Sequence, residues 1–327
     1  MQAAWYSKNG EARDVLSVGE LPTPIPTGAE VRVSLATSGV NPSDVKSRRA
    51  RPISDSLIVP HSDGAGVIDA VGDDVSPTRI GERVWIWNGQ WQRPLGTAAT
   101  HIVVPSEQAV PLPDNTDFAA GACLGIPALT AFQAINLLGD IRGKTVLVIG
   151  AASAVGHYAA QMAVLAGARA IGTVGSDERA AHAMTAGIQD TINYKTESVA
   201  ARITALTGGK GVDAIVDMDF CSTARLLGEG VLASHGVVAC YGSNEVGEIG
   251  IPFRPALFGS FTLRFFLVYD LTPEERRVAL AGLSALLEKG LLKHAVGARF
   301  GLLDIVAAHE AVEHGRVIGN VVIDLPA

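Results

Sequence analysis

The chain has 327 residues, of which 48% are hydrophobic and 18% charged, and its formal net charge is −7. This composition is typical of a globular protein with two domains and excludes a disordered or collagen-like chain. The acidic balance argues against a nucleic-acid partner, because a phosphate backbone is bound by a basic face, and against a polybasic membrane tether.

The three cysteines, Cys123, Cys221 and Cys240, lie far apart and form no C-x-x-C pair. An odd number of widely spaced cysteines argues against a disulfide framework, which is typical of small secreted domains. The first residues also show no secretory pattern. We therefore expect a reducing, cytoplasmic location.

The chain up to residue 117 is predicted to be rich in β-strands. Apolar residues occur there in short runs that prolines and glycines interrupt, as in an all-β or barrel-like region. After Pro113 the pattern changes, and the following alanines and leucines have helical spacing. The predicted strands are 30–36, 66–71, 82–87 and 101–104, and the helical stretch is 118–138.

Strands and helices alternate in the middle of the chain. Near-continuous apolar strands separated by helices predict a parallel sheet with helices on both faces. One uncharged stretch, 145–168, is long enough to cross a bilayer, but its small and polar residues divide it into a strand, a turn and a helix. The predicted strands are 144–149, 169–174, 189–193, 212–216 and 236–241, and the predicted helices are 157–166, 177–186 and 198–206.

The C-terminal segment contains four further predicted elements. The apolar residues 258–269 are expected to include an edge strand. Thr272, followed by Pro273, is a typical N-terminus for a helix that continues to residue 289. A helix at 305–313 and a strand at 319–325 follow.

These elements predict an α/β protein with two domains. A dinucleotide-binding domain with a doubly wound parallel sheet is expected at residues 118–258. Residues 1–117 and 259–327 are expected to form one discontinuous β-rich domain, with the cofactor crevice between the two domains.

A glycine turn joins the first strand of the alternating region to its helix. Its run Gly150-Ala-Ala-Ser-Ala-Val-Gly156 is an incomplete G-x-G-x-x-G pattern, which gains weight from its position between a strand and a helix. The free amides and positive dipole of the helix N-terminus would bind a pyrophosphate, with Ser153 in place of the middle glycine. The expected contacts are Gly150, Ala152, Ser153, Ala154, Val155 and Gly156.

The end of the second strand indicates which dinucleotide is bound. An NAD site places a carboxylate there for the ribose 2′-hydroxyl, whereas this chain has Gly175. Ser176 and Arg179 can donate hydrogen bonds to a 2′-phosphate, and Tyr194, after the third strand, can reach the same group or the adenine. NADPH is therefore predicted in preference to NADH.

Several runs spread over the chain resemble one family. They are Gly39-Val-Asn-Pro-Ser-Asp-Val-Lys-Ser-Arg48, the run from His61 to Gly72, Gly81-Glu-Arg-Val84 and Gly319-Asn-Val-Val322. Together with the glycine turn they resemble the medium-chain dehydrogenase/reductase superfamily, in its zinc-free quinone oxidoreductase (zeta-crystallin-like) branch. The resemblance implies a GroES-like β-rich catalytic domain and a Rossmann domain, in a protein that is usually a homodimer.

The zinc-dependent members of this superfamily differ at the metal ligands. They have Cys at the position of Asn41 and His-Glu at the positions of Ser62 and Asp63. Because a catalytic zinc needs about three N, S or O ligands, we expect no zinc. His61 and His101 are expected to be scaffold groups.

The resemblance also implies the residues of the active cleft. Asn41 and Asp44 would lie in it, and the Asn41 amide could donate to an oxyanion that develops on the substrate. Thr130 would contact the nicotinamide end of the cofactor. The other cofactor contacts implied are Gly242, Ser243, Phe265, Phe266 and Asn320.

Lys46 is a departure from the quinone reductases, which often have an aromatic residue at this position. The run Asn-Pro-x-Asp-x-Lys-x-Arg instead is similar to that of alkenal/enone oxidoreductases in the same branch. The lysine could stabilise the oxyanion or relay a proton. Alternatively, it pairs with Asp44 or with solvent.

The sequence thus predicts an NADPH-dependent reductase that transfers a hydride to a small-molecule quinone or activated C=C acceptor. One alternative is an enoyl-thioester reductase, for which Arg48, Arg49 and Arg51 would supply a basic patch for a carrier phosphate. The other is a non-catalytic, cofactor-binding structural protein. The acidic charge and the presence of both Asn41 and Thr130 argue against this last alternative.

Overall fold

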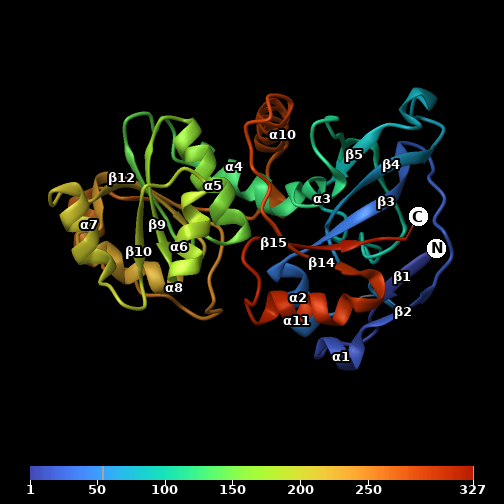
Figure 1. Cartoon of the computed structure of the whole chain (residues 1–327), viewed down its shortest axis with the longest axis horizontal. Coiled ribbons are helices and arrows are strands. Elements are labelled where there is room, and N and C mark those ends of the chain that lie inside the picture. The colour runs from blue at the N-terminus through green and yellow to red at the C-terminus, as the bar shows by residue number, and fades with distance from the viewer. Residues whose placement is uncertain (54, 327) are drawn as a thin grey trace. The chain divides into compact units, whose positions relative to one another are not determined.

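The computed structural model describes residues 1–53 and 55–326, and the chain divides into two compact units (Figure 1). The first unit contains residues 1–126 and 286–327, and the second contains residues 127–285. The N-terminal and C-terminal parts of the chain are therefore joined in one unit.

The second unit is built on a six-stranded sheet whose strands are all parallel, as predicted. The order of the strands reverses between β8 and β11. Ligands of such doubly wound sheets bind outside the carboxyl ends of the strands at this point. Across the sheet the strands are β10 (Asp190–Asn193), β9 (Arg169–Val174), β8 (Thr145–Val148), β11 (Val212–Asp217), β12 (Leu232–Cys240) and β13 (Thr262–Phe265).

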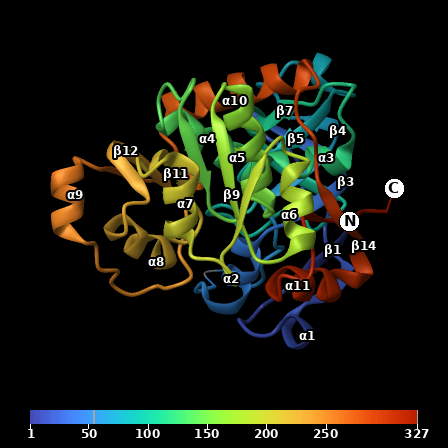
Figure 2. The same cartoon turned by 60° about the vertical axis from the view of Figure 1, so that its left-hand side comes forward.

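Helices cover both faces of this sheet, which explains why its strands are almost continuously apolar. Leu147, Ile171, Ile192 and Ile215, from four neighbouring strands, are completely buried in its core. Figure 1 and Figure 2 show α5 (Ala154–Leu165) and α6 (Asp177–Met184) on one face, and α7 (Val199–Thr207) and α8 (Phe220–Thr223) on the other. The unit also contains α4 (Leu129–Leu137), α9 (Phe253–Gly259) and most of α10 (Pro273–Glu288).

The limits of the second unit differ from the expected 118–258 at both ends. The predicted edge strand is present as β13, but it pairs with β12 and completes the sheet of the second unit. Helix α10 also packs on this unit. Gln133 Nε2 of α4 donates to Glu275 Oε1 at 3.0 Å, and Gly282 lies directly against the Phe132 ring.

The first unit contains a seven-stranded, mostly antiparallel sheet, which agrees with the predicted β-rich region. Its order is β14 (Val296–Gly301), β15 (Asn320–Asp324), β3 (Glu30–Val40), β4 (Asp63–Val71), β5 (Arg83–Ile86) and β7 (Ala109–Pro111), and β6 (His101–Pro105) also pairs with β3. Antiparallel pairing of β15 with β3 joins the C-terminal segment to this sheet. A separate two-stranded sheet consists of β1 (Gln2–Trp5) and β2 (Ser17–Glu20).

In the described residues of the first unit, four α-helices accompany the sheet, and two of them, the first two along the chain, were not anticipated. They are α1 (Ala12–Val15), α2 (Pro42–Ala50), α3 (Phe118–Gly121) and α11 (Ile305–Glu313). Helix α2 begins directly after β3 and contains the run in which Asp44 and Lys46 were singled out. It is therefore the element that positions the candidate catalytic residues of this unit.

Two predicted helices differ from the structure by more than two residues in their bounds. The stretch 118–138 is interrupted between α3 and α4 by a π-helical turn, Leu124–Ala128, which contains Pro127; proline lacks the N–H that a continuous helix needs. The helix expected at 157–166 begins earlier, at Ala154. Ser153 Oγ accepts the Gly156 amide at 3.0 Å and so caps it.

Candidate active site

The glycine turn between β8 and α5 is closed by contacts that leave no space for side chains. Gly150 has φ +69°, and a Cβ there would overlap the sulfur of Met218. A Cβ on Gly156 would overlap the Gly150 carbonyl. Thr173 of β9 holds the turn, since its hydroxyl oxygen accepts the Gly150 amide at 2.9 Å. The first amides of α5, on Ala154 and Val155, have no acceptor within the helix and can receive an anion.

Gly175 directly follows β9 and lies beside two residues that follow β10. A Cβ on Gly175 would lie 2.9 Å from Tyr194 Oη and 3.3 Å from Lys195 Cε. Ser176 caps α6, because its Oγ accepts the Arg179 amide at 3.3 Å. Tyr194 and Lys195 thus lie beside Gly175, and Ser176 and Arg179 follow it in the first turn of α6. Lys195 was missed by sequence reasoning, although it directly follows Tyr194.

The carboxyl end of β11 carries a buried acid that sequence reasoning also missed. Asp217 accepts hydrogen bonds from the Asp219 amide and from Thr223 Oγ1, both at 2.9 Å. Burial raises the pKa of its carboxyl to about 6. Its Oδ2 is buried without a hydrogen-bond partner in the described part of the chain. The sequence signal was an aspartate directly after an apolar strand, at the edge where the ligands of such sheets bind.

The remaining predicted cofactor residues of this unit lie just after β12 and at the end of β13. The Gly242 carbonyl accepts the Phe220 amide at 3.0 Å, and Ser243 Oγ accepts the Glu245 amide at 3.2 Å. Phe265 is 60% exposed and meets the Phe220 ring edge-on, with the centroids 5.0 Å apart. The Phe266 ring lies 6.1 Å from that of Tyr241.

Two hydroxyl groups of the second unit are buried without partners among the residues described. They are Thr130 Oγ1, on α4, and Tyr241 Oη, at the end of β12. Burial raises the pKa of Tyr241, so its phenol is a neutral donor. Since a buried polar group without a partner is costly, both hydroxyls are candidate contacts for a polar ligand.

In the first unit, Asn41 connects two buried carboxyl groups. Its backbone amide donates to Asp44 Oδ2 at 2.7 Å, and its side-chain Nδ2 donates to Asp63 Oδ2 at 2.8 Å. The Asn41 side chain also accepts the backbone N–H of Asp44, which completes a capping box at the start of α2. One hydrogen of the Asn41 amide is thus donated to Asp63, which leaves the other for a ligand.

Burial raises the pKa of both carboxyl groups. The pKa of Asp44 rises to about 7, and that of Asp63 rises well above its ordinary value. The Asp44 side chain, on the first turn of α2, therefore holds a proton up to neutral pH. A carboxylic acid in this state can act as a proton donor.

Lys46 and Asn320, the two other predicted site residues of the first unit, differ in their surroundings. Lys46 is exposed and makes no ion pair with any residue that the structure describes, so a pair with Asp44 is excluded. Asn320 is buried at the start of β15, where its backbone amide and its Nδ2 donate to the Ala295 carbonyl at 2.7 and 3.1 Å. The Asn320 side chain therefore supports the junction with β14.

The arginines after Lys46 do not form the basic patch that an enoyl-thioester reductase would need. Arg48 is completely buried, and its Nη2 donates to Glu313 Oε2 at 2.8 Å. Arg49 pairs with Glu11 and, at 2.7 Å, with Glu313. Arg51 is the one of the three that makes no ion pair with any described residue.

His61 belongs to a buried polar network. Its Nδ1 lies 2.9 Å from Ser38 Oγ, and its Nε2 lies 2.9 Å from His309 Nε2 of α11. Burial lowers the pKa of both histidines, so the imidazoles are neutral. Within residues 1–53 and 55–326, no group of three or more His, Cys, Asp or Glu side chains could hold a metal ion.

Known proteins were compared with the chain by sequence and by structure. Residues 27–114 match the family model of the alcohol dehydrogenase GroES-like domain, and residues 154–285 match that of a zinc-binding dehydrogenase. Quinone oxidoreductase from Homo sapiens is 31% identical over 300 residues, which cover 90% of this chain and 89% of the human protein. The chain belongs to the quinone oxidoreductase branch of the medium-chain dehydrogenase/reductase superfamily. It is an oxidoreductase with a GroES-like unit and a Rossmann-type unit.

Solved structures agree with this assignment. The crystal structure of an NAD-dependent alcohol dehydrogenase is 30% identical and has a TM-score of 0.89, with 100% of both chains covered. That of Escherichia coli quinone oxidoreductase complexed with NADPH is 25% identical, with a TM-score of 0.86 over 99% of this chain and 100% of that chain. No helix in the described residues is long and apolar enough to span a membrane.

Asp44→Asn should change how stability depends on pH. In the folded protein Asp44 keeps its proton up to about pH 7, whereas the unfolded chain releases it near pH 4, so wild-type stability falls across this window by about 1.4 kcal/mol per pH unit. Asparagine has no such proton. The urea midpoint of Asp44→Asn relative to wild type is therefore expected to be higher at pH 8 than at pH 5.

Asp73→Asn, at an exposed position, is the matched control and should show the same difference at both pH values. If Asp44→Asn also differs from wild type equally at pH 5 and pH 8, Asp44 is ionised in the folded protein and the raised pKa is wrong.

Proposed function

We propose that the protein is a zinc-independent, NADPH-dependent reductase whose acceptor is a quinone or an enone or alkenal with an activated C=C bond. The observation that carries the cofactor assignment is the group around Gly175. This glycine stands where a carboxylate would select NADH. Tyr194 and Lys195 lie beside it, and Ser176 and Arg179 follow it at the start of α6. The similarity to quinone oxidoreductases, one of them solved with NADPH, supports the same assignment.

The residues of the second unit fit this cofactor. The amides of Ala154 and Val155 would bind the pyrophosphate, and the cations near Gly175 would bind the 2′-phosphate. Thr130 Oγ1 and Tyr241 Oη, both without partners in the described residues, would bind polar groups toward the nicotinamide end. When bound, NADPH supplies the hydride that the electron-poor carbon of the acceptor receives.

Residues of the first unit would stabilise the negative charge that forms on the acceptor and would supply the proton that completes its reduction. The second hydrogen of the Asn41 amide and the exposed ammonium of Lys46 would stabilise the oxyanion that forms on the acceptor. The Asp44 carboxyl, whose pKa is about 7, would supply the proton. An enoyl thioester is less well supported, because Arg48 and Arg49 are paired with carboxylates.

The cofactor assignment is tested by steady-state kinetics with quinones, enones and enoyl thioesters. We expect turnover with NADPH roughly tenfold or more faster than with NADH, unchanged by dialysis against a zinc chelator. Arg179→Ala and Lys195→Ala should each raise the KM for NADPH but not that for NADH. Lys210→Ala, a surface lysine of the same unit, is the control.

Two outcomes would contradict this assignment. Equal effects on the KM for both cofactors would remove Arg179 and Lys195 from the 2′-phosphate site. No turnover with any acceptor would rule out the reductase and favour a structural, cofactor-binding role.

Lys46→Ala tests the part assigned to this lysine. Loss of a cation that stabilises a developing oxyanion should lower kcat/KM with an enone about tenfold or more. Lys46→Arg should keep part of the rate, and Lys8→Ala, also exposed on the first unit, should have no effect. Unchanged enone turnover in Lys46→Ala would make Lys46 a solvated surface residue.

We also propose that the protein is a cytoplasmic homodimer. Its three cysteines are free thiols, which suits a reducing compartment. Strand β13 is at the edge of its sheet, and exposed apolar side chains lie on it and on α9, the helix that precedes it. Among them, Phe253 is 71%, Leu257 58%, Phe258 74% and Phe265 60% exposed. A second copy of the chain would cover this face through a two-fold interface.

Phe258→Asp should therefore convert the dimer to a monomer in sedimentation equilibrium, because it places a charge in an apolar interface. Leu303→Asp, at an exposed leucine of the first unit, is the matched control and should leave the mass unchanged. A wild-type protein that sediments as a monomer would contradict the proposal.

A further inference from the structure

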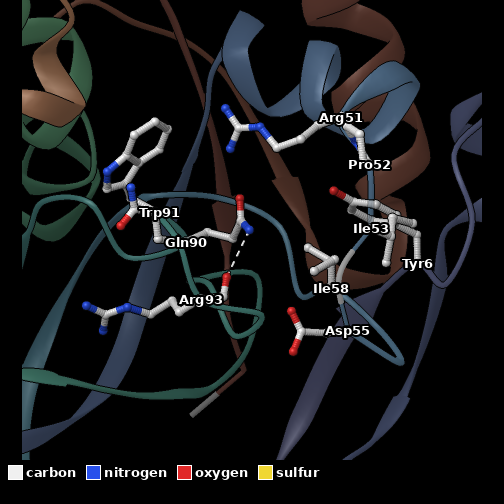
Figure 3. A pocket seen from close by; sticks show the side chains of 10 residues that line it. Tyr6, Arg51, Pro52, Ile53, Asp55, Ile58, Gln90, Trp91 and Arg93 are labelled. Carbon is white, nitrogen blue, oxygen red and sulfur yellow. Dashed lines mark hydrogen bonds between the residues drawn. The ribbon is translucent and has the colours of Figure 1, made fainter.

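The first unit contains a cavity of about 420 Å³ that no step of the proposed reaction uses. Figure 3 shows its lining side chains. They come from the segment after β1, from the segment that follows α2, and from the loop after β5. This volume is within the range of small-molecule sites.

Arg51 lines the cavity with a guanidinium that is held in place but not neutralised. Its backbone is fixed at the end of α2: its amide donates to the Ser47 carbonyl, and its carbonyl accepts Asn9 Nδ2, each at 3.0 Å. The guanidinium carbon lies 5.2 Å from the centroid of the Trp91 ring, a cation–π contact. No carboxylate of the described residues pairs with it.

Arg93, on the same cavity, is held by neutral acceptors. Its Nη2 donates to Gln108 Oε1 at 2.5 Å and its Nη1 to the Val103 carbonyl at 3.4 Å. Burial lowers the pKa of Arg93. No described carboxylate forms an ion pair with Arg93, although the charge of Glu30 acts on it, so the Arg93 guanidinium adds a positive charge to that of Arg51.

The cavity also has an apolar wall and one acid. Ile53, Ile58 and the Tyr6 ring line one side in Figure 3, and Asp55 lies apart from the Arg51 guanidinium. With Arg51, Arg93 and Asp55, the formal charge of the lining side chains is +1. This balance suits a ligand with a single negative charge better than a dianion.

The cavity lies at the C-terminal end of α2, the helix that carries the candidate proton donor. The charges of Asp44 and Arg51 influence each other, and Tyr6 is affected by both. A ligand on Arg51 would lie against the end of the helix that carries Asp44 and Lys46.

We propose that this cavity binds the carboxylate of a planar, apolar molecule, with the carboxylate on Arg51 and the apolar part against Trp91 and the isoleucines. The planar guanidinium fork matches a carboxylate in two parallel hydrogen bonds. The acceptor of the reductase is accordingly an unsaturated or quinonoid carboxylic acid. This second statement rests on the proposed function, whereas the binding site does not.

Binding is tested by calorimetry with 2-naphthoate, its neutral analogue 2-naphthamide and the dianionic 2-naphthyl phosphate. Naphthoate should bind about tenfold or more tightly than either of the others. Arg51→Gln should remove this preference, and Arg51→Lys should keep part of it. Arg49→Gln, the same change two residues earlier and outside the cavity, should keep all of it.

Equal affinity for naphthoate and naphthamide, or an unchanged preference in Arg51→Gln with a wild-type melting curve, would overturn the site. Tighter binding of the phosphate would overturn the choice of a carboxylate.

Turnover is tested with an enone pair that differs only in the acid, trans-3-benzoylacrylate and its amide. The ratio of their kcat/KM values should favour the acid about tenfold in wild type and in Arg49→Gln, and should fall toward one in Arg51→Gln. A ratio near one in wild type would overturn the acidic acceptor. If neither compound nor any other acceptor is reduced, the proposed function fails, while the calorimetric result still decides the binding site.

Discussion

The capping box at Asn41 is the constraint on which the arrangement of the first unit's site depends. This residue lies between β3 and α2 and hydrogen-bonds two buried carboxyl groups, Asp44 through its backbone and Asp63 through its side chain. Burial away from water destabilises a charged carboxylate. The pKa of both carboxyl groups is therefore raised, and both keep their protons to higher pH. The direction of α2, and of every side chain that it carries, follows from this junction.

The other end of α2 is fixed by the C-terminal segment. Arg48 is buried against Glu313 of α11, and removal of either partner would leave an uncompensated charge. Asn9 Nδ2 lies within hydrogen-bond distance of the Ser47, Arg48 and Arg51 carbonyls. Three arginines that are neighbours in sequence therefore have different surroundings: Arg48 and Arg49 are bound to carboxylates, whereas Arg51 is positioned over Trp91 with its charge available.

The sheet of the second unit was predictable because its signals are local. Each strand is a short apolar run, and the glycine turn lies between a strand and a helix. The sequence also indicates the start of helix α2, since Asn41, Pro42 and Asp44 are typical residues of a capped helix N-terminus. The helix was not predicted because the segments around it have a β-rich pattern. The contacts of Arg51 with Trp91 and of Lys195 with Gly175 were not predictable. Each contact joins separate segments of the chain, and the spacing of residues in the sequence does not show which segments are close in space.

Three of the glycines assigned to the dinucleotide, Gly150, Gly156 and Gly175, satisfy different physical requirements. Gly150 adopts a positive φ, which few other residues do without strain. At Gly156 the requirement is the absence of a side chain, because the first turn of α5 packs directly against the Gly150 carbonyl. At Gly175 the requirement is space: a larger side chain would displace Tyr194 and Lys195, and a carboxylate would meet the lysine directly. Only this third glycine bears on which dinucleotide is bound, and its effect depends on the residues after β10 rather than on the glycine turn itself.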